Sequence, residues 1–275
     1  MNKKLAIIVA LFGLVFGVTG VATYASIHGG LATYKIDETK TINVKDINSI
    51  KFDARLAGVH IYPTDSDKIT AHLHGGTNRK DVELTAQANG NTAVIEVRPK
   101  KEYMITFFSF NDLKIDLEIP KKTYHQFQAH SSAGSITMEQ VAADHFDLHS
   151  SAGSITVENS RGDLTAHSSA GSIKLINMDG KLDLTDSAGS IDIKVKSILH
   201  DIRAKSSAGS VRIVTEQEPK NLQMDLHTSA GNVDVALPGA SFSIKEHQNA
   251  IGSIGTGGPM VQLKSSAGSI SIQKQ

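Results

Sequence analysis

The sequence predicts an all-β protein: a parallel β-solenoid (β-helix) of coils of about 19 residues, with an irregular β cap at its N-terminal end and one transmembrane α-helix before it. Three observations support this prediction. A motif centred on Ser-Ala-Gly-Ser-Ile recurs through the second half of the chain, apolar and polar residues alternate around each copy, and an uncharged stretch follows the N-terminus. Strict alternation is typical of half-buried strands.

The N-terminal stretch is predicted to be a membrane anchor. Residues 5–25 carry no charge and follow Lys3 and Lys4. A helix of this length crosses the roughly 30 Å hydrocarbon layer, whereas the apolar region of a cleaved signal usually has about 7–15 residues. The positive-inside rule then predicts a single-pass protein of the cell membrane, with the bulk of the chain extracytoplasmic. A cleaved signal is the alternative, because small residues between Gly20 and Ala25 could form a processing site.

The same patterns divide the chain into four segments. Residues 1–25 form the anchor, and residues 26–45 form a short polar spacer. Residues 46–122 are strand-like but less regular, which predicts an irregular β cap or early coils. Residues 123–275 hold the solenoid repeats.

The repeat predicts how the coils stack. His-Ser-Ser-Ala-Gly-Ser-Ile begins at His130, His149 and His167, and shorter copies continue to the C-terminus, including a degenerate copy around Gly252. A two-strand unit buries its apolar face only against a neighbouring unit, so the copies predict eight coils stacked in sequence order. The regular copies centre on Gly134, Gly153, Gly171, Gly189, Gly209, Gly231 and Gly268.

These glycines are interpreted as structural corners of the coils. A corner needs a residue that tolerates positive φ, and small neighbours that stack without crowding. No helix is predicted after any of them, so a phosphate site at a helix N-terminus is not expected.

Three histidines are the candidate site residues. His130, His149 and His167 occupy the same place in successive repeats, so stacked coils would align them in a ladder. Such a ladder could share a zinc ion or respond to pH. The favoured interpretation is a solvated surface without metal or cofactor, because the same column continues as Thr185 and Lys205.

Composition restricts the remaining functions. Lysine plus arginine and aspartate plus glutamate both number 28, so no net charge attracts nucleic acid. The absence of cysteine excludes disulfides, thiolate metal sites and a cysteine nucleophile. A carbohydrate-active β-helix enzyme is the alternative, but such enzymes place clustered acids in long loops, for which most of these coils leave no room. The chain is therefore predicted not to be an enzyme.

A family resemblance rests on two features. Residues 113–121 read LKIDLEIPK, and tandem Ser-Ala-Gly-Ser-Ile units follow them. This arrangement resembles the bacterial "putative adhesin" family of β-strand-repeat proteins, and the single N-terminal anchor is similar to its LiaG-like membrane-anchored type, associated with envelope-stress operons. The resemblance implies a binding or scaffolding role in the cell envelope, with an envelope component or a membrane protein as partner. It supplies no catalytic residue.

Overall fold

A computed structural model describes residues 34–100 and 111–275. The predicted anchor, residues 1–25, lies outside the described residues. In the part of the chain that the structure describes, no helix is long and apolar enough to cross a membrane.

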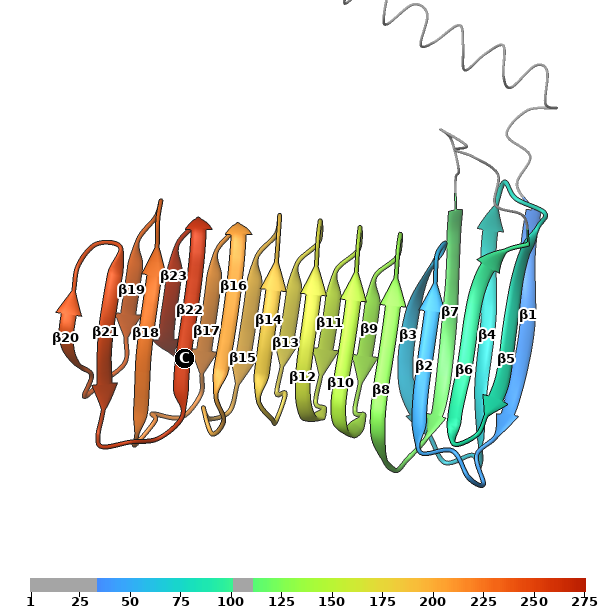
Figure 1. Ribbon diagram of the computed structural model, residues 1–275, viewed down its shortest axis with the longest axis horizontal. Helices are drawn as coiled ribbons and strands as arrows, with labels where there is room; N and C mark the ends of the chain where they lie inside the picture. Colours follow the sequence, from blue (N-terminus) through green and yellow to red (C-terminus); the bar gives the residue numbers. More distant parts are fainter. Residues whose placement is uncertain (1–33, 101–110) are drawn as a thin grey trace, which may run out of the picture.

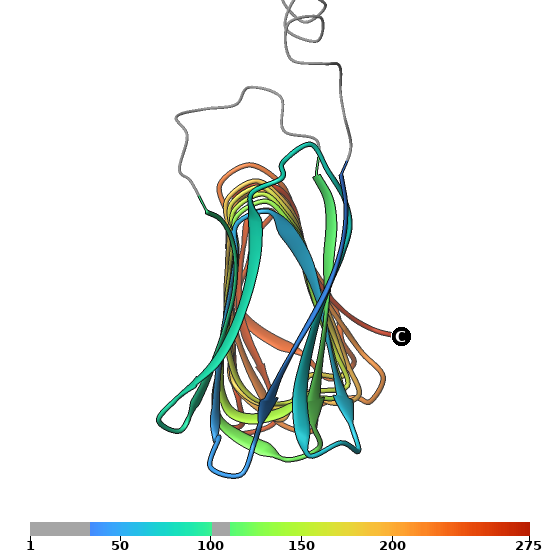
Figure 2. The ribbon, with the colours of Figure 1, turned by 90° about the vertical axis from the view of Figure 1, so that its right-hand side faces the viewer.

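Two long β-sheets face each other across one core (Figures 1 and 2). Sheet A has 11 strands, in the spatial order β1 (Tyr34–Asn43), β4 (Lys68–Thr77), β7 (Asn111–Pro120), β3 (Ala57–Thr64), β9 (Ile136–Glu139), β11 (Ile155–Glu158), β13 (Ile173–Ile176), β15 (Ile191–Val195), β17 (Val211–Thr215), β23 (Ile270–Lys274) and β19 (Val233–Ala236). Sheet B has 12 strands, in the order β20 (Ser241–Lys245), β21 (Asn249–Ile254), β18 (Leu222–Thr228), β22 (Met260–Ala267), β16 (Ile202–Ala208), β14 (Leu182–Asp186), β12 (Arg161–Ser168), β10 (Ala142–Ser150), β8 (Thr123–Ser131), β2 (Ser49–Ala54), β6 (Thr92–Pro99) and β5 (Val82–Asn89).

The central coils stack in register. Each coil from β8/β9 to β16/β17 gives one strand to each sheet, and from β10 onward each strand pairs in parallel with the equivalent strand of the preceding coil. Inward residues therefore form columns of like side chains, such as the fully buried Ile155, Ile173 and Ile191. Burial of each such side chain contributes about 1.5–3 kcal/mol. The predicted all-β, parallel-rich stack of coils is confirmed for these residues.

At the C-terminal end the spatial order departs from the sequence, which corrects the predicted stack of eight consecutive coils. Strand β22 pairs with β16 on one side and β18 on the other, and β23 lies between β17 and β19. The last coil of the chain is thus an interior coil (Figure 1). Strands β20 and β21 then close sheet B with antiparallel pairs, and Gly252 lies within β21 rather than at a corner. Because the repeats have nearly identical inward faces, the sequence pattern fits both a stack in sequence order and the observed order with the last coil inside.

The N-terminal end is closed in a similar way. The coils β2/β3 and β6/β7 pair in parallel with each other, and β2/β3 also pairs with β8/β9. Strands β1, β4 and β5 then add antiparallel pairs at the outer end. Strand β1 lies within the segment assigned to the spacer, and Ile42 is its one buried residue. This explains the polar appearance of its sequence.

Candidate functional site

The seven glycine corners lie directly on top of one another. A Cβ atom on Gly153 would collide with the carbonyl oxygen of Gly134, and one on Gly171 with that of Gly153. Of the seven, Gly231 and Gly268 alone have positive φ. The predicted need for positive φ is therefore wrong for the other five, where the reason for glycine is the close approach of two backbones. The non-glycine residues with positive φ in the central coils lie instead at the end of the sheet A strands, at Gln140, Asn159 and Asn177.

Serines before each glycine tie neighbouring coils together. Ser150 Oγ accepts a hydrogen bond from Gly153 N at 2.9 Å and donates one to the carbonyl oxygen of Gly134 at 3.2 Å. Ser168, Ser206 and Ser265 donate similar hydrogen bonds to the carbonyl oxygen of the glycine in the adjacent coil. These hydroxyls are buried structural groups, so they are not available as nucleophiles.

Asp186 replaces serine in this buried column. Its side chain is fully buried, and neither carboxyl oxygen makes a hydrogen bond of normal geometry. Burial raises the pKa of Asp186, although the backbone N–H groups of Ser187, Gly189 and Ala188 act in the opposite direction. Burial therefore favours the neutral form of this carboxyl more than water does.

The predicted histidine ladder is present on the outer face of sheet B. His149 lies directly opposite His130 and His167, with ring centroids 6.4 and 5.7 Å away. His149 Nε2 also contacts Asp147 Oδ1 at 2.9 Å. The three rings run along a line and do not converge on one point. Within residues 34–100 and 111–275 they are not among the groups whose ligand atoms converge as a metal site requires.

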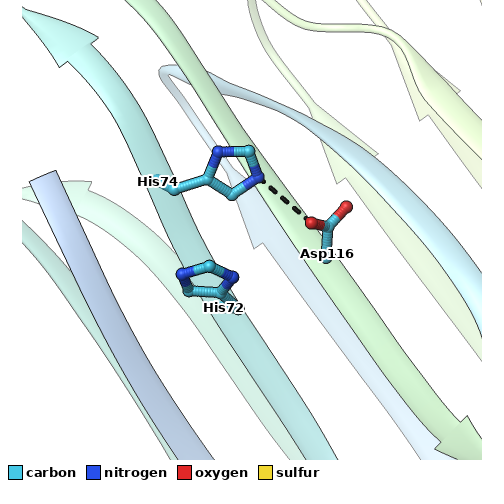
Figure 3. A group of neighbouring side chains, drawn as sticks. All are labelled: His72, His74 and Asp116. Carbon is cyan, nitrogen blue, oxygen red and sulfur yellow. Dashed lines mark hydrogen bonds and ion pairs between the residues drawn. The ribbon is translucent and has the colours of Figure 1, made fainter.

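A different group of histidines does converge, on the outer face of sheet A. Figure 3 shows His72 and His74 side by side on β4, next to Asp116 of β7. One ligand atom from each of the three residues lies within 4.8 Å of the other two. His74 Nε2 donates a hydrogen bond to Asp116 Oδ2 at 3.1 Å, and the His72 and His74 ring centroids are 4.9 Å apart. We call these three residues the β4 histidine cluster.

Strand pairing explains how this cluster forms. Ile69, Ala71 and Leu73 of β4 point into the core, so the alternate residues His72 and His74 point outward. The antiparallel register of β4 and β7 places Asp116 directly opposite His72.

Two further carboxylates, outside the cluster, make hydrogen bonds to histidines in and beside it. His72 Nε2 donates a hydrogen bond to Asp37 Oδ1 of β1 at 2.9 Å, and this contact lowers the pKa of Asp37. On the other side of Asp116, His60 Nε2 of β3 donates to Glu139 Oε1 at 3.1 Å. His60 Nδ1 lies 4.0 Å from Asp116 Oδ1.

A third feature is a groove of about 390 Å³ on the outer face of sheet B, lined by polar and apolar residues. It crosses the beginnings of β10, β12, β14, β16 and β22, which at roughly 4.8 Å per strand makes it about 19 Å long. Its ionisable residues are His145, Asp163, Lys181, Asp183, Asp201 and Arg203. We call it the sheet B groove.

The family model described as Toastrack DUF4097 matches residues 47–166 and again residues 125–273. The chain belongs to this family. Membership confirms the resemblance to a family of β-strand-repeat proteins that the repeated motif predicts. The two overlapping Toastrack matches together cover nearly all of the described strands.

Two solved structures are similar to this Toastrack chain. One is titled a "putative cell adhesion protein" from Clostridium sporogenes ATCC 15579, with 11% identity and a TM-score of 0.40, covering 88% of this chain and 100% of that one. The other is titled a "putative adhesin" from Bacteroides fragilis NCTC 9343, with 16% identity and a TM-score of 0.41, covering 87% of this chain and 98% of that one. Comparison with curated proteins gives no match.

The functional features of this Toastrack protein were only partly foreseeable from its sequence. The ladder was predicted because its histidines repeat with the coils. The β4 histidine cluster was missed because its members come from strands without the repeat motif, separated by 42 residues between His74 and Asp116. The His-x-His spacing at residues 72–74 was the one available signal, since it places both rings on one face of a strand.

Proposed function

We propose that this Toastrack protein is a membrane-anchored, extracytoplasmic and non-enzymatic binding protein of the cell envelope. The observation that carries the proposal is the sheet B groove, which crosses five adjacent strands of the stack and is lined by both polar and apolar residues. The backbones of successive coils are in contact at the glycine corners, which supports binding on the outer faces of the sheets rather than between coils.

The groove fits an extended polar polymer of the envelope. Its acidic and basic groups alternate from coil to coil, as at Asp183 and Arg203, which lie opposite each other with 3.7 Å between Oδ2 and Nη1. An extended chain crossing the strands would meet a new set of polar groups about every 4.8 Å. This regular array supports recognition of a repeating polymer.

The acids of the groove are engaged in the fold, which favours binding over hydrolysis. Asp163 Oδ1 accepts a hydrogen bond from the backbone N–H of Lys181 at 3.0 Å, and Asp201 Oδ1 accepts one from that of Met260 at 2.9 Å. A glycosidase instead needs a carboxylic acid and a second carboxylate facing the scissile bond. We therefore keep the non-enzymatic function as our proposal.

The anchor is the second part of the proposal. Residues 5–25 are uncharged and follow two lysines, which supports one membrane crossing with the coils outside. Fractionation of cells that express the full chain, and of cells that express a variant without residues 2–25, tests this part. We expect the full chain in the membrane fraction, resistant to extraction by carbonate, and accessible to protease added to spheroplasts.

Binding is tested with the detergent-solubilised full chain and purified wall polymers. The double variant Asp183→Ala/Arg203→Ala removes an opposite pair from the groove. The matched control, Lys174→Ala/Asp192→Ala, removes an opposite pair from the outer face of sheet A. We expect the groove variant to bind at least tenfold more weakly and the control to bind normally. Equal binding by both variants would contradict a site in the groove.

Three alternatives give different results in the same experiment. Loss of polymer binding in His130→Ala/His149→Ala/His167→Ala, with retention in the groove variant, would make the histidine ladder the binding surface. Release of shortened polymer during incubation would show an enzyme and overturn the proposal. Retention of an envelope protein without any polymer would replace the polymer with a protein partner.

A further inference from the structure

We propose that the β4 histidine cluster binds a divalent transition-metal ion, with Zn²⁺ as the best match. Two imidazoles and one carboxylate are a ligand set that Zn²⁺ uses in open sites with a fourth, non-protein position. Among the described residues, His72, His74 and Asp116 are the one group of three whose ligand atoms converge within 4.8 Å.

The spacing of the three ligand atoms is close to that of a bound ion. Zn–N distances of about 2.0–2.1 Å place tetrahedral ligands roughly 3.4 Å apart. His74 Nε2 and Asp116 Oδ2 are already 3.1 Å apart, and the largest separation in the cluster is below 4.8 Å. The antiparallel register of β1, β4 and β7 holds the backbones of these residues and of Asp37 in place. Rotation of the side chains is then enough to bring the ligand atoms from their present separations to those around a bound ion.

The hydrogen bond from His72 to Asp37 orients a ligand. Asp37 accepts from Nε2 of His72, which leaves Nδ1 of that ring for the metal ion. A carboxylate that holds the second nitrogen of a metal-bound histidine is the usual outer partner in zinc proteins. The metal ion would take the place of the proton between His74 and Asp116.

A second histidine–carboxylate pair supports Asp116 from the other side. His60 Nδ1 faces Asp116 Oδ1 at 4.0 Å, while His60 Nε2 is held by Glu139 at 3.1 Å. Asp116 therefore has one oxygen toward His74 and one toward His60. We infer that His60 positions the carboxylate and is not itself a ligand.

The site is accessible from solvent. The side chains of His72, His74 and Asp116 are 39%, 36% and 35% exposed. Three protein ligands leave a fourth position for water or for a donor group of a bound partner. The nearest cation in the register is Lys114, which lies directly opposite His74 and would repel the ion. Lys114→Ala is therefore expected to tighten binding.

The test uses the metal-free, detergent-solubilised full chain in two titrations. Calorimetry measures the binding of Zn²⁺, and visible absorption measures the binding of Co²⁺. We expect one Zn²⁺ per chain and the intense visible bands of tetrahedral Co²⁺. His72→Ala/His74→Ala should abolish both signals, and Asp37→Asn should weaken Zn²⁺ binding by about 10–100-fold. The matched control is His149→Ala, which removes an exposed histidine that also contacts a carboxylate.

Thermal unfolding of each variant establishes that it is folded before its binding is compared. Zn²⁺ binding that is unchanged in His72→Ala/His74→Ala would overturn the proposal, and its loss in His149→Ala would place the ion at the ladder instead. The absence of stoichiometric binding by the folded wild-type chain would also overturn the proposal. Weaker binding in Asp37→Asn with an intact Co²⁺ spectrum would support the assignment of Asp37 as an orienting residue.

Discussion

Gly153 lies against the backbone of Gly134, so closely that a Cβ atom on Gly153 would lie 2.3 Å from the Gly134 carbonyl oxygen. The same relationship recurs at each corner of the regular repeats. Corner glycines therefore allow the coils to approach to the spacing of paired strands.

The first prediction concerns this contact. Gly153→Ala must push two coils apart, and overpacking of this kind costs about 1–3 kcal/mol. We expect a fall in the midpoint of thermal unfolding of about 2–4 °C for each kcal/mol. The control is Gly76→Ala, since a Cβ atom there meets nothing within 4 Å. Equal midpoints for the two variants would contradict the steric role of the corner.

The second prediction concerns the order of the coils. Strand β22 lies beside β16, with Ala208 directly opposite Ala267 and both residues exposed. Neighbouring parallel strands have Cα separations that suit a disulfide, and the chain has no cysteine of its own. We expect Ala208→Cys/Ala267→Cys to form an intramolecular disulfide on oxidation, detected by mass spectrometry. A stack in sequence order would leave both thiols free.

Removal of the last coil is the third prediction. Residues 260–275 bury Val261, Leu263, Ile270 and Ile272 between two other coils. At about 1.5–3 kcal/mol each, these side chains contribute roughly 6–12 kcal/mol, which is comparable with the stability of a whole domain. Deletion of residues 260–275 is therefore expected to abolish the cooperative urea transition. A truncated chain that unfolds cooperatively would contradict the interior position of this coil.

The fourth prediction concerns Asp186 and pH. Burial raises the pKa of this carboxyl above the ordinary value of 3.8, so the folded state binds a proton more tightly than the unfolded state. Its contribution to stability is present below about pH 3.8 and is lost as the pH rises through the pKa of the folded state.

Asp186→Ser restores the residue found at this place in most coils. We expect the free energy of unfolding of this variant to exceed that of the wild type at neutral pH, and the difference to shrink on acidification. Urea titrations at several pH values measure both quantities. A constant difference across the pH range would contradict the titration of Asp186.

The fifth prediction concerns the left-handed corner of Asn159. Its φ is 50°, and its Oδ1 accepts a hydrogen bond from Asn177 Nδ2 at 3.1 Å. Asparagine tolerates this conformation better than alanine does, so Asn159→Ala should cost about 1–2 kcal/mol. Asn159→Gly keeps the backbone relaxed and loses only the amide contact. Thermal unfolding should therefore rank wild type above Asn159→Gly, and Asn159→Gly above Asn159→Ala.

The sequence by itself determined the secondary structure class, the repeat length and the place of the corners. Alternation fixes which residues of a strand point inward, and a motif that recurs every coil must occupy equivalent positions in a stack. For this reason the ladder of His130, His149 and His167 was predictable to the residue.

Only the tertiary structure decided the order of the coils at both ends and the partners of the strands outside the repeat. Similar coils have interchangeable inward faces, so nothing local to residues 260–275 distinguishes an interior place from a terminal one. The β4 histidine cluster was also not predictable from the sequence. Asp37, His72 and Asp116 meet because three strands, distant in sequence, adopt one antiparallel register across the end of sheet A, and a register between distant strands is set by packing rather than by local pattern.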